Sequence, residues 1–259
     1  MTGAFVRGSA VLLAALAPAS GAGAAPRPVV LAAAPAHVTL AGSARTTVRV
    51  TNSGTKRVRV DVSRAGFALD LRGRPRVVPN GGPGSAAGWL TFRPMRFALA
   101  PHASVSLGVA AKLPRRAEPG DHDALVLLST RPLDSGHVGV RLRLGVVVVV
   151  RAPGAVVRRL ELRGLRAARR GPGRVLELLV ANRGNVTEAL GRALAVLSPE
   201  RRRGRRAVLV ATSRDLRPRT RGIVEFRLRG PRHGWTTAQV LIPAAEGRSA
   251  LTGTYRLRL

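Results

Sequence analysis

The chain has 259 residues and carries 44 Lys+Arg against 13 Asp+Glu, a formal net charge of +31. It contains no cysteine, which excludes disulfides, thiolate catalysis, iron–sulfur clusters and cysteine-ligated zinc. Apolar residues make up 45% of the chain, enough for a hydrophobic core, so the charge does not indicate disorder. The length is typical of one or two domains.

The N-terminal segment, residues 1–25, has the order of a secretory signal peptide. One cation, Arg7, precedes the apolar run 10–17, and small residues follow as far as Ala25. No later run approaches the ~20 apolar residues that a membrane-spanning helix needs. We therefore expect an exported mature chain without a transmembrane segment.

Residues 26–150 are predicted to form one domain of β-strands. Apolar residues alternate with polar ones, so that Val58, Val60 and Val62 share one face of a strand. The glycine-rich stretch 69–88 is expected to be a long loop or an edge excursion. The expected strands are 47–51, 57–63, 89–92, 97–99, 104–113, 123–130 and 138–150. Strands at this spacing are typical of a β-sandwich.

A linker at 151–155 is expected to separate this domain from a second one at 156–259. The triplet Asn182-Arg183-Gly184 repeats Asn52-Ser53-Gly54, and in both we expect Asn and Gly to supply turn conformations. The segments 166–173 and 198–206 are expected to be basic turns, and 189–197 fits either a strand or a helix. The other expected strands are 157–162, 175–181, 207–212, 223–228, 235–242 and 254–259. The predicted fold is all-β, with two tandem immunoglobulin-like β-sandwich domains after the signal peptide.

Two blocks of the first domain resemble known families. Residues 48–74 resemble the opening of bacterial immunoglobulin-like domains of the pilus-chaperone (PapD-like) type. Residues 86–130 resemble the peptidoglycan-binding domain of WxL-interacting surface proteins. The matching residues are Trp89, Pro94, Phe97, Leu99, Pro101, Pro119, Gly120 and Leu125. This resemblance implies a cell-envelope protein of a Gram-positive, actinobacterial cell, whereas residues 156–259 match only a generic immunoglobulin-like domain.

Acidic residues that could carry chemistry are few and scattered. The best cluster is Asp121, His122 and Asp123 with Glu118 nearby, and Asp121 and Asp123 share a strand face as loose oxygen ligands would. A solvent turn that enters a strand explains the same residues without any ligand. We therefore predict no catalytic residue, no metal site and no cofactor, and a protein that is not an enzyme.

Arginine clusters are the strongest functional signal in the sequence. A planar guanidinium pairs phosphate or carboxylate at two points, so a polyanion-binding surface is one interpretation; a solvated surface that reflects a GC-rich genome is the other. The candidate polyanion-binding residues are Arg169, Arg170, Arg201, Arg202, Arg203, Arg205 and Arg206. Nucleic acid is disfavoured, because export and a 3% aromatic content both argue against it.

The two tryptophans, Trp89 and Trp235, fit core packing or, alternatively, a stacking platform for a glycan. The leading functional hypothesis is a secreted, non-enzymatic, wall-associated scaffold that binds peptidoglycan, an anionic wall polymer or another surface protein. The alternative hypothesis is a pilus-chaperone-like assembly factor that donates a β-strand to a partner protein. That alternative requires a long exposed edge strand and a basic pair at the inter-domain cleft, for which Arg143, Arg151, Arg158 and Arg159 are the candidates.

Overall fold

The structure is a computed structural model that describes residues 30–259 except 80, 83, 132–141, 201–204, 231–232 and 244–248. The predicted signal segment therefore lies outside the described residues. In the part described, the regular structure is strands together with one short 3-10 turn, η1 (Ala87–Trp89). The described residues include no helix long and apolar enough to cross a membrane. The all-β prediction is confirmed.

The first β-sandwich packs two sheets around a core of valine, leucine and alanine. One sheet has the strand order β1 (Leu31–Ala34), β3 (Arg45–Asn52), β8 (Ser104–Ala111), β6 (Leu90–Arg93). The facing sheet has the order β2 (His37–Ala41), β10 (Arg143–Ala152), β9 (Gly120–Arg131), β4 (Val58–Leu69), β5 (Pro75–Val78), with β7 (Arg96–Leu99) also paired to β4. Val126 of β9 and Val148 of β10 are fully buried in this core. Their odd-numbered neighbours in the strands therefore face the other side of the sheet.

The second β-sandwich has a separate core that includes the fully buried Phe226. One sheet has the order β11 (Leu160–Arg170), β12 (Gly173–Asn182), β17 (Arg221–Leu228). The other has the order β15 (Ala207–Val210), β14 (Leu194–Pro199), β18 (Trp235–Ile242), β19 (Leu251–Arg258), and β13 (Glu188–Ala189) pairs with β16 (Asp215–Leu216). The segment 189–197, open between strand and helix, contributes to β13 and β14. Two tandem sandwiches are thus confirmed, and the exact boundaries, including the linker at 151–155, stay predictions.

The expected basic turn at 166–173 is wrong over most of its length. Residues 166–170 continue β11, which pairs with β12 through the turn at Gly171 and has a β-bulge between Leu162 and Gly164. Glu177 of β12 lies directly across from Arg166 and neutralises part of the strand's charge. The alternation of β1, β2 and β5 was too short to be predicted, and all three are edge or near-edge strands.

The repeated Asn-x-Gly triplet marks the same corner in both sandwiches, but for a different reason than expected. Neither Gly54 nor Gly184 has a positive φ. The side chains of Asn52 and Asn182 are fully buried, and their amide oxygens accept the N–H groups of Gly54 and Gly184 at 3.0 and 2.9 Å. Gly184 is required by close packing, because a Cβ there would lie 2.2 Å from a backbone oxygen of the inter-domain segment.

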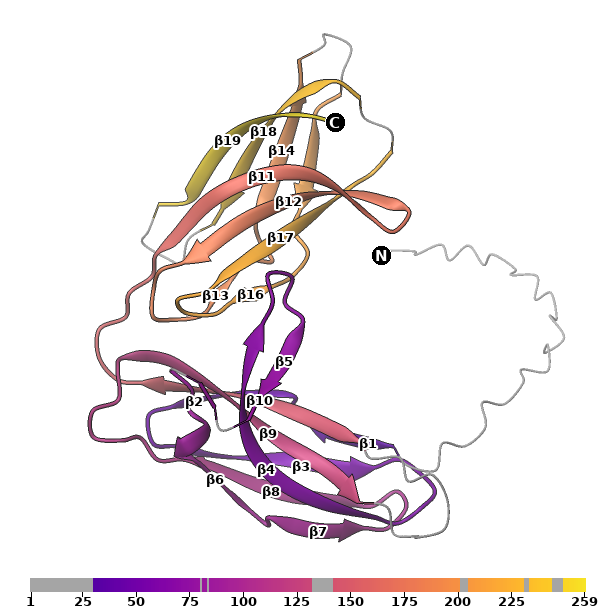
Figure 1. Cartoon of the computed structure of the whole chain (residues 1–259), viewed down its shortest axis with the longest axis vertical. Coiled ribbons are helices and arrows are strands. Elements are labelled where there is room, and N and C mark those ends of the chain that lie inside the picture. Colours follow the sequence, from indigo (N-terminus) through magenta and orange to yellow (C-terminus); the bar gives the residue numbers. More distant parts are fainter. Residues whose placement is uncertain are drawn as a thin grey trace, which may run out of the picture.

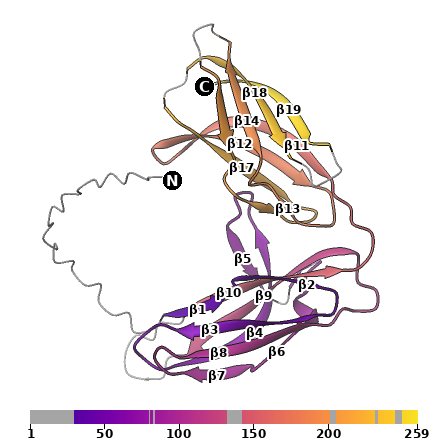
Figure 2. The same cartoon turned by 180° about the vertical axis from the view of Figure 1, so that it is seen from behind.

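A hairpin formed by β4 and β5 projects from the first sandwich to the second (Figure 1). The reverse view shows the same contact, with β5 reaching the region of β13 and β17 (Figure 2). At its tip the carbonyl of Leu71 accepts the N–H of Ile223 at 2.6 Å and the Nη1 of Arg214 at 2.7 Å. Arg72 pairs with the buried Glu177 at 3.1 Å. The expected loop at 69–88 therefore includes an arm that joins the two domains.

Candidate functional site

One carboxylate, that of Asp121, ties the first domain to the second. Asp121 is the second residue of β9 and lies across from Arg151 of β10, which donates to both of its oxygens at 2.6 and 3.0 Å. The backbone N–H of Thr187 in the second domain donates to the same carboxylate at 2.8 Å. Burial opposes ionisation, but these hydrogen bonds and the charge of Arg151 outweigh it and hold the pKa of Asp121 below its ordinary value. Asp121, held by Arg151, thus accepts a hydrogen bond from the second domain, and we call this contact the pin at Asp121.

A second contact of this kind, the pin at Asp123, lies two residues further along β9 and on the same face of the strand. Arg217 of the second domain forms an ion pair with Asp123, donates to the carbonyl of Phe67 at 2.9 Å and lies over the Phe67 ring at 4.0 Å. Burial raises the pKa of the Asp123 carboxyl, and the charge of Arg217 opposes the rise. Arg219 reaches Glu118 at 2.8 Å beside it. Every one of these arginines is therefore committed to holding the domains together.

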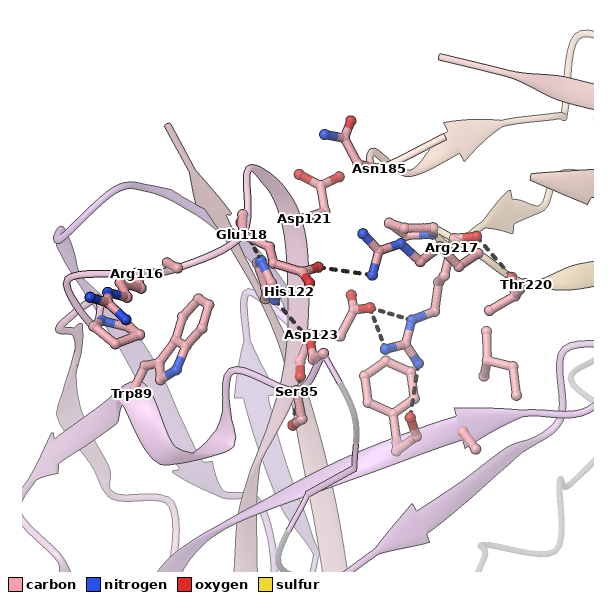
Figure 3. Close-up of a pocket in the computed structure, with 18 residues that line it drawn as sticks. Ser85, Trp89, Arg116, Glu118, Asp121, His122, Asp123, Asn185, Arg217 and Thr220 are labelled. Carbon is pink, nitrogen blue, oxygen red and sulfur yellow. Dashed lines mark hydrogen bonds and ion pairs between the residues drawn. The ribbon is translucent and has the colours of Figure 1, made fainter. Parts of the chain in front are cut away.

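These groups line an inter-domain pocket of about 690 Å³ (Figure 3). The rings of Trp89 and His122 lie 4.5 Å apart at one end, and Arg217 closes the other end against Asp123. Both ring nitrogens of His122 face backbone carbonyls, those of Glu118 at 2.7 Å and Gly84 at 3.1 Å. Among the described residues, no three His, Asp or Glu side chains gather as metal ligands. The sequence cluster at 118–123 thus serves inter-domain packing in the structure.

The edge of the first domain's sheet is open along the first residues of β10. β2 covers this edge only from Val147 to Arg151. The N–H of Val147 donates to Ala36, on the β2 side, whereas the carbonyl of Leu142 accepts from Thr130 of β9. Because successive residues of a strand point their backbone groups to opposite sides, Arg143 and Gly145 direct N–H and C=O away from β9. In the part of the chain that the structure describes, no strand pairs with that side of Arg143–Val146.

An apolar groove of about 480 Å³ lies on the sheet face beside this open edge. Its floor is the non-core face of β9 and β10, with Leu125, Leu127 and Val147, and the arm supplies Phe67 and Val77. The second domain closes one side through Thr187, Asp215 and Arg217, and Arg143 lies at the groove. The groove therefore combines a strand edge, an apolar floor and walls from both domains.

The predicted basic pair at the cleft does not form from the expected residues. Arg143 lines the groove, but Arg151 is held by Asp121 at the far end of β10. Arg158 pairs with Glu188 at 3.0 Å and Arg159 with Glu161 at 3.5 Å. The cation that does face the groove with Arg143 is Arg217, from the second domain. Sequence reasoning missed Arg217 because only the fold brings a residue at 217 next to β9.

The candidate polyanion-binding arginines fall into different environments. Arg170 is bound to Glu177 and Glu225, whereas Arg169 is exposed on the same strand. Arg205 and Arg206 are exposed at the start of β15. Arg201, Arg202 and Arg203 lie outside the described residues. No finding tests polyanion binding by this set, which stays a prediction.

The two tryptophans are both partly covered by neighbouring side chains. Trp89 packs against the first core and beside His122. Trp235 is 47% exposed, and the guanidinium of Arg256 lies 4.5 Å above its ring. Arg256 is itself held by Glu200 through two hydrogen bonds at 2.7 and 2.9 Å. Glycan stacking by either tryptophan remains an untested prediction.

Comparison with solved structures places the fold among fimbrial chaperones. The chain is similar to the class 5 fimbriae chaperone CfaA, with 14% identity, 87% of this chain and 98% of that chain covered, and a TM-score of 0.51. It is also similar to a chain of the chaperone–tip adhesin complex of CFA/I fimbriae biogenesis, with 13% identity, the same coverage and a TM-score of 0.50. No family model and no curated protein sequence matches the chain. The PapD-like part of the sequence resemblance is thereby confirmed at the level of the fold.

The leading functional hypothesis, a wall-associated scaffold that binds peptidoglycan or an anionic wall polymer, is corrected by this comparison. Two solved structures that share the two-domain fold over most of its length are a fimbrial chaperone and a chain of a fimbrial chaperone–adhesin complex. No comparison supports the narrower resemblance to WxL-interacting proteins or a place in a Gram-positive wall. The motif residues from Trp89 to Leu125 were misleading, because they mark structural positions of a sandwich. Leu99 lies in the first core, Leu125 is buried on the other face of its sheet, and Pro101 sits in a turn.

Proposed function

We propose that the chain is an exported, non-enzymatic assembly chaperone that completes the sheet of a partner protein by pairing a strand with it at the open edge of β10. The observation that carries this proposal is the side of Arg143–Val146 with which no described strand pairs, where Arg143 and Gly145 direct their N–H and C=O groups outward. An extended partner segment satisfies these groups, and the backbone hydrogen bonds give affinity without dependence on side chains. The partner is a secreted surface protein with an incomplete sheet, as the fimbrial chaperone fold suggests.

Side chains around the edge fit an apolar partner. In the sequence, apolar residues alternate at Val138, Val140, Leu142 and Leu144 before the core valines of β10. Leu144 is only partly buried at the margin of the first core. Apolar side chains beside a strand edge can pack against the core of a protein that pairs with that edge.

The second domain has a defined part in this proposal. The arm and the pins at Asp121 and Asp123 fix one domain against the other, and Arg217 and Thr187 then form a wall of the groove. A pre-formed groove reduces the entropy lost on binding, since neither domain has to be reoriented. Arg151 binds Asp121 and Arg217 binds Asp123, and these ion pairs restrict movement of one domain relative to the other.

The proposal is tested first by photo-crosslinking in the producing organism. A photoreactive amino acid replaces Arg143, and the matched control carries it at Arg49, an exposed arginine on the central strand β3 of the opposite sheet. We expect position 143 to capture one predominant secreted protein that position 49 does not capture. Capture of the same proteins with equal yield from both positions contradicts the proposal.

The captured partner is then purified with two variants of the chain. Arg143→Pro removes an outward N–H at the first residue of the strand, a position that tolerates proline, whereas Arg143→Ala removes only the side chain. Backbone pairing predicts that Arg143→Pro weakens binding by about tenfold or more, a difference of roughly 1.4 kcal/mol, and that Arg143→Ala changes it little. Equal losses for both variants assign the contact to the arginine side chain and overturn strand addition.

A further inference from the structure

The second domain exposes a patch of aliphatic side chains on the outer face of the sheet that contains β15, β14, β18 and β19. Val208 of β15 lies across from Val196 of β14. Val210 lies across from Leu194, which has Leu241 of β18 on its other side. The residues between them along each strand belong to the core, so these five side chains point away from it. Val208 and Val210 are each 63% exposed, and we call the five together the aliphatic patch.

The aliphatic patch is turned away from the first domain (Figure 1). The arm contacts the other sheet of the second sandwich, through Ile223 of β17 and Glu177 of β12. The two sheets of a sandwich face each other across the core, so their outer faces point in opposite directions. The edge of β15 is itself joined to β17, since Ala211, directly after the strand, bridges to Phe226. This part of the surface therefore offers the side chains of a sheet face and not a strand edge.

Arginines and a tryptophan surround the aliphatic patch. Arg206 is exposed directly before β15, and Arg258 is exposed on the outer face of β19. Trp235 lies across from Arg258 and is 47% exposed, with the guanidinium of Arg256 at 4.5 Å from the centre of its ring. The four strands contain no Asp or Glu, and Glu200, directly after β14, is bound by Arg256. The face thus combines apolar side chains with positive charge.

A lipid surface fits this combination better than a folded protein does. Interfaces between folded proteins depend on large side chains anchored in pockets, whereas a bilayer adapts to an open face of short valine and leucine side chains. Such side chains enter the boundary between headgroups and acyl chains, an indole lies at the level of the headgroups, and guanidinium groups pair with phosphates. A second copy of the chain is a poor occupant, because a net charge of +31 makes two copies repel each other.

We propose that the aliphatic patch docks the protein on the surface of a bilayer that contains anionic phospholipids. Arg206 and Arg258 lie at the lipid phosphates, and Trp235 lies at the edge of the contact. The contact is peripheral, because the side chains of Val208 and Val210 are short and enter only the outermost part of the acyl region. It involves the other domain from the edge of β10 and does not depend on the function proposed for that edge.

The test measures quenching of tryptophan fluorescence by vesicles with brominated acyl chains. The chain has two tryptophans, Trp235 beside the aliphatic patch and Trp89 in the first domain, so Trp235→Phe leaves only the distant reporter. With vesicles of phosphatidylglycerol and phosphatidylcholine at physiological salt, we expect the parent chain to lose fluorescence and the Trp235→Phe chain to keep it. Vesicles of phosphatidylcholine alone should neither bind the parent chain nor quench it.

Paired valine variants test the apolar part of the contact by co-sedimentation with the same vesicles. Val208→Thr combined with Val210→Thr keeps the charge and the strand propensity, and we expect it to weaken binding by about tenfold. The matched control combines Val156→Thr with Val157→Thr, which alters valines of the inter-domain segment that are 54% and 50% exposed. The control pair should bind within about twofold of the parent chain.

Arginine variants test the charged part. Arg206→Gln and Arg258→Gln are each expected to weaken binding by about fivefold, and Arg49→Gln, on β3 of the first domain, by less than about twofold. Quenching that persists in the Trp235→Phe chain, equal binding to phosphatidylcholine alone, or equal losses for the two valine pairs overturns the proposal. Binding without any quenching of the parent chain reports adsorption by net charge alone and also overturns it.

Discussion

Asp121 shows how one carboxylate can join a strand ladder to a second domain. Its oxygens receive Arg151 from the neighbouring strand and the N–H of Thr187 from the other domain. The Asp121 side chain is 1% exposed, so losing the charge leaves Arg151 and the Thr187 amide with weaker acceptors. The sequence suggested that Asp121 and Asp123 share a face, which is correct. It could not show that each is bound by an arginine, because Arg217 is far away along the chain.

The pKa of Asp121 lies below its ordinary value, so its ionised form stabilises the folded state. That contribution is present above about pH 4 and is lost as the pH falls through the lowered pKa of the folded chain. Asp121→Asn should therefore reduce the free energy of unfolding by about 1–3 kcal/mol at pH 7. The difference from the parent chain should shrink as the pH falls below about 4 and through the lowered pKa of the folded chain.

Urea unfolding of both chains across this pH range checks the prediction. Glu118→Gln serves as the control, since that carboxyl is 63% exposed and its pair with Arg219 is a surface one, for which we expect a change below about 1 kcal/mol. A destabilisation by Asp121→Asn that is constant from pH 7 to pH 2 contradicts the assignment of the effect to the charge.

At the scale of elements, the arm formed by β4 and β5 is the part that sequence reasoning could describe least. Strand alternation predicted β4 as far as residue 63, but the strand continues to Leu69, where residues face a second domain instead of a core. The arm's contacts are a backbone hydrogen bond to Ile223 and pairs made by Arg72 and Arg214. None of these has a periodic signature, because each depends on the position of another domain.

Shortening the arm should uncouple the two domains without unfolding either. The change replaces residues 70–74 with an Asn-Gly turn, which keeps β4 paired with β5 and removes Leu71 and Arg72. Spin labels on cysteines introduced at Arg49 and Thr254, both exposed, report the distance between the domains in this naturally cysteine-free chain. We expect a narrow distance distribution in the parent chain and a broad one in the shortened chain.

A matched control is Arg76→Ala, which alters an exposed residue of the arm away from its tip. Its distance distribution should be as narrow as that of the parent chain. If the shortened chain also keeps a narrow distribution, the pins at Asp121 and Asp123 suffice and the arm has no coupling role.

At the scale of the whole molecule, the alternation of polar and apolar residues predicted two sandwiches, because a strand of a sandwich has one face toward the core and one face away from it. Val58, Val60 and Val62 are all buried as the alternation requires. The sequence also pointed to the corner at Asn52 and Asn182, although the reason proved to be buried side-chain hydrogen bonds. The groove and the open edge of β10 could not be predicted, since an unpaired edge depends on which strand stops short. For β10 that strand is β2, whose pairing begins only at Val147.

The leading functional hypothesis drawn from the sequence was wrong at this same scale, whereas the alternative of a pilus-chaperone-like factor is the one that the fold favours. A net charge of +31 favoured an anionic polymer as partner, but many of the arginines are used within the molecule. Arg151, Arg170 and Arg217 each hold a carboxylate, and Arg214 holds the arm. A count of charged residues cannot tell arginines that pair with carboxylates inside the molecule from arginines that form a binding surface. The side-chain contacts in the structure can make this distinction.

The central claim is that a partner strand pairs with the open edge of β10. The most direct measurement is amide exchange of the purified complex with the partner captured at position 143, compared with the free chain. The claim predicts that the amides of Arg143 and Gly145, which point outward, exchange at least about tenfold more slowly in the complex, while the amide of Leu144 is unchanged. Unchanged exchange at Arg143 and Gly145 in a stable complex would contradict strand addition at this edge and place the partner elsewhere on the molecule.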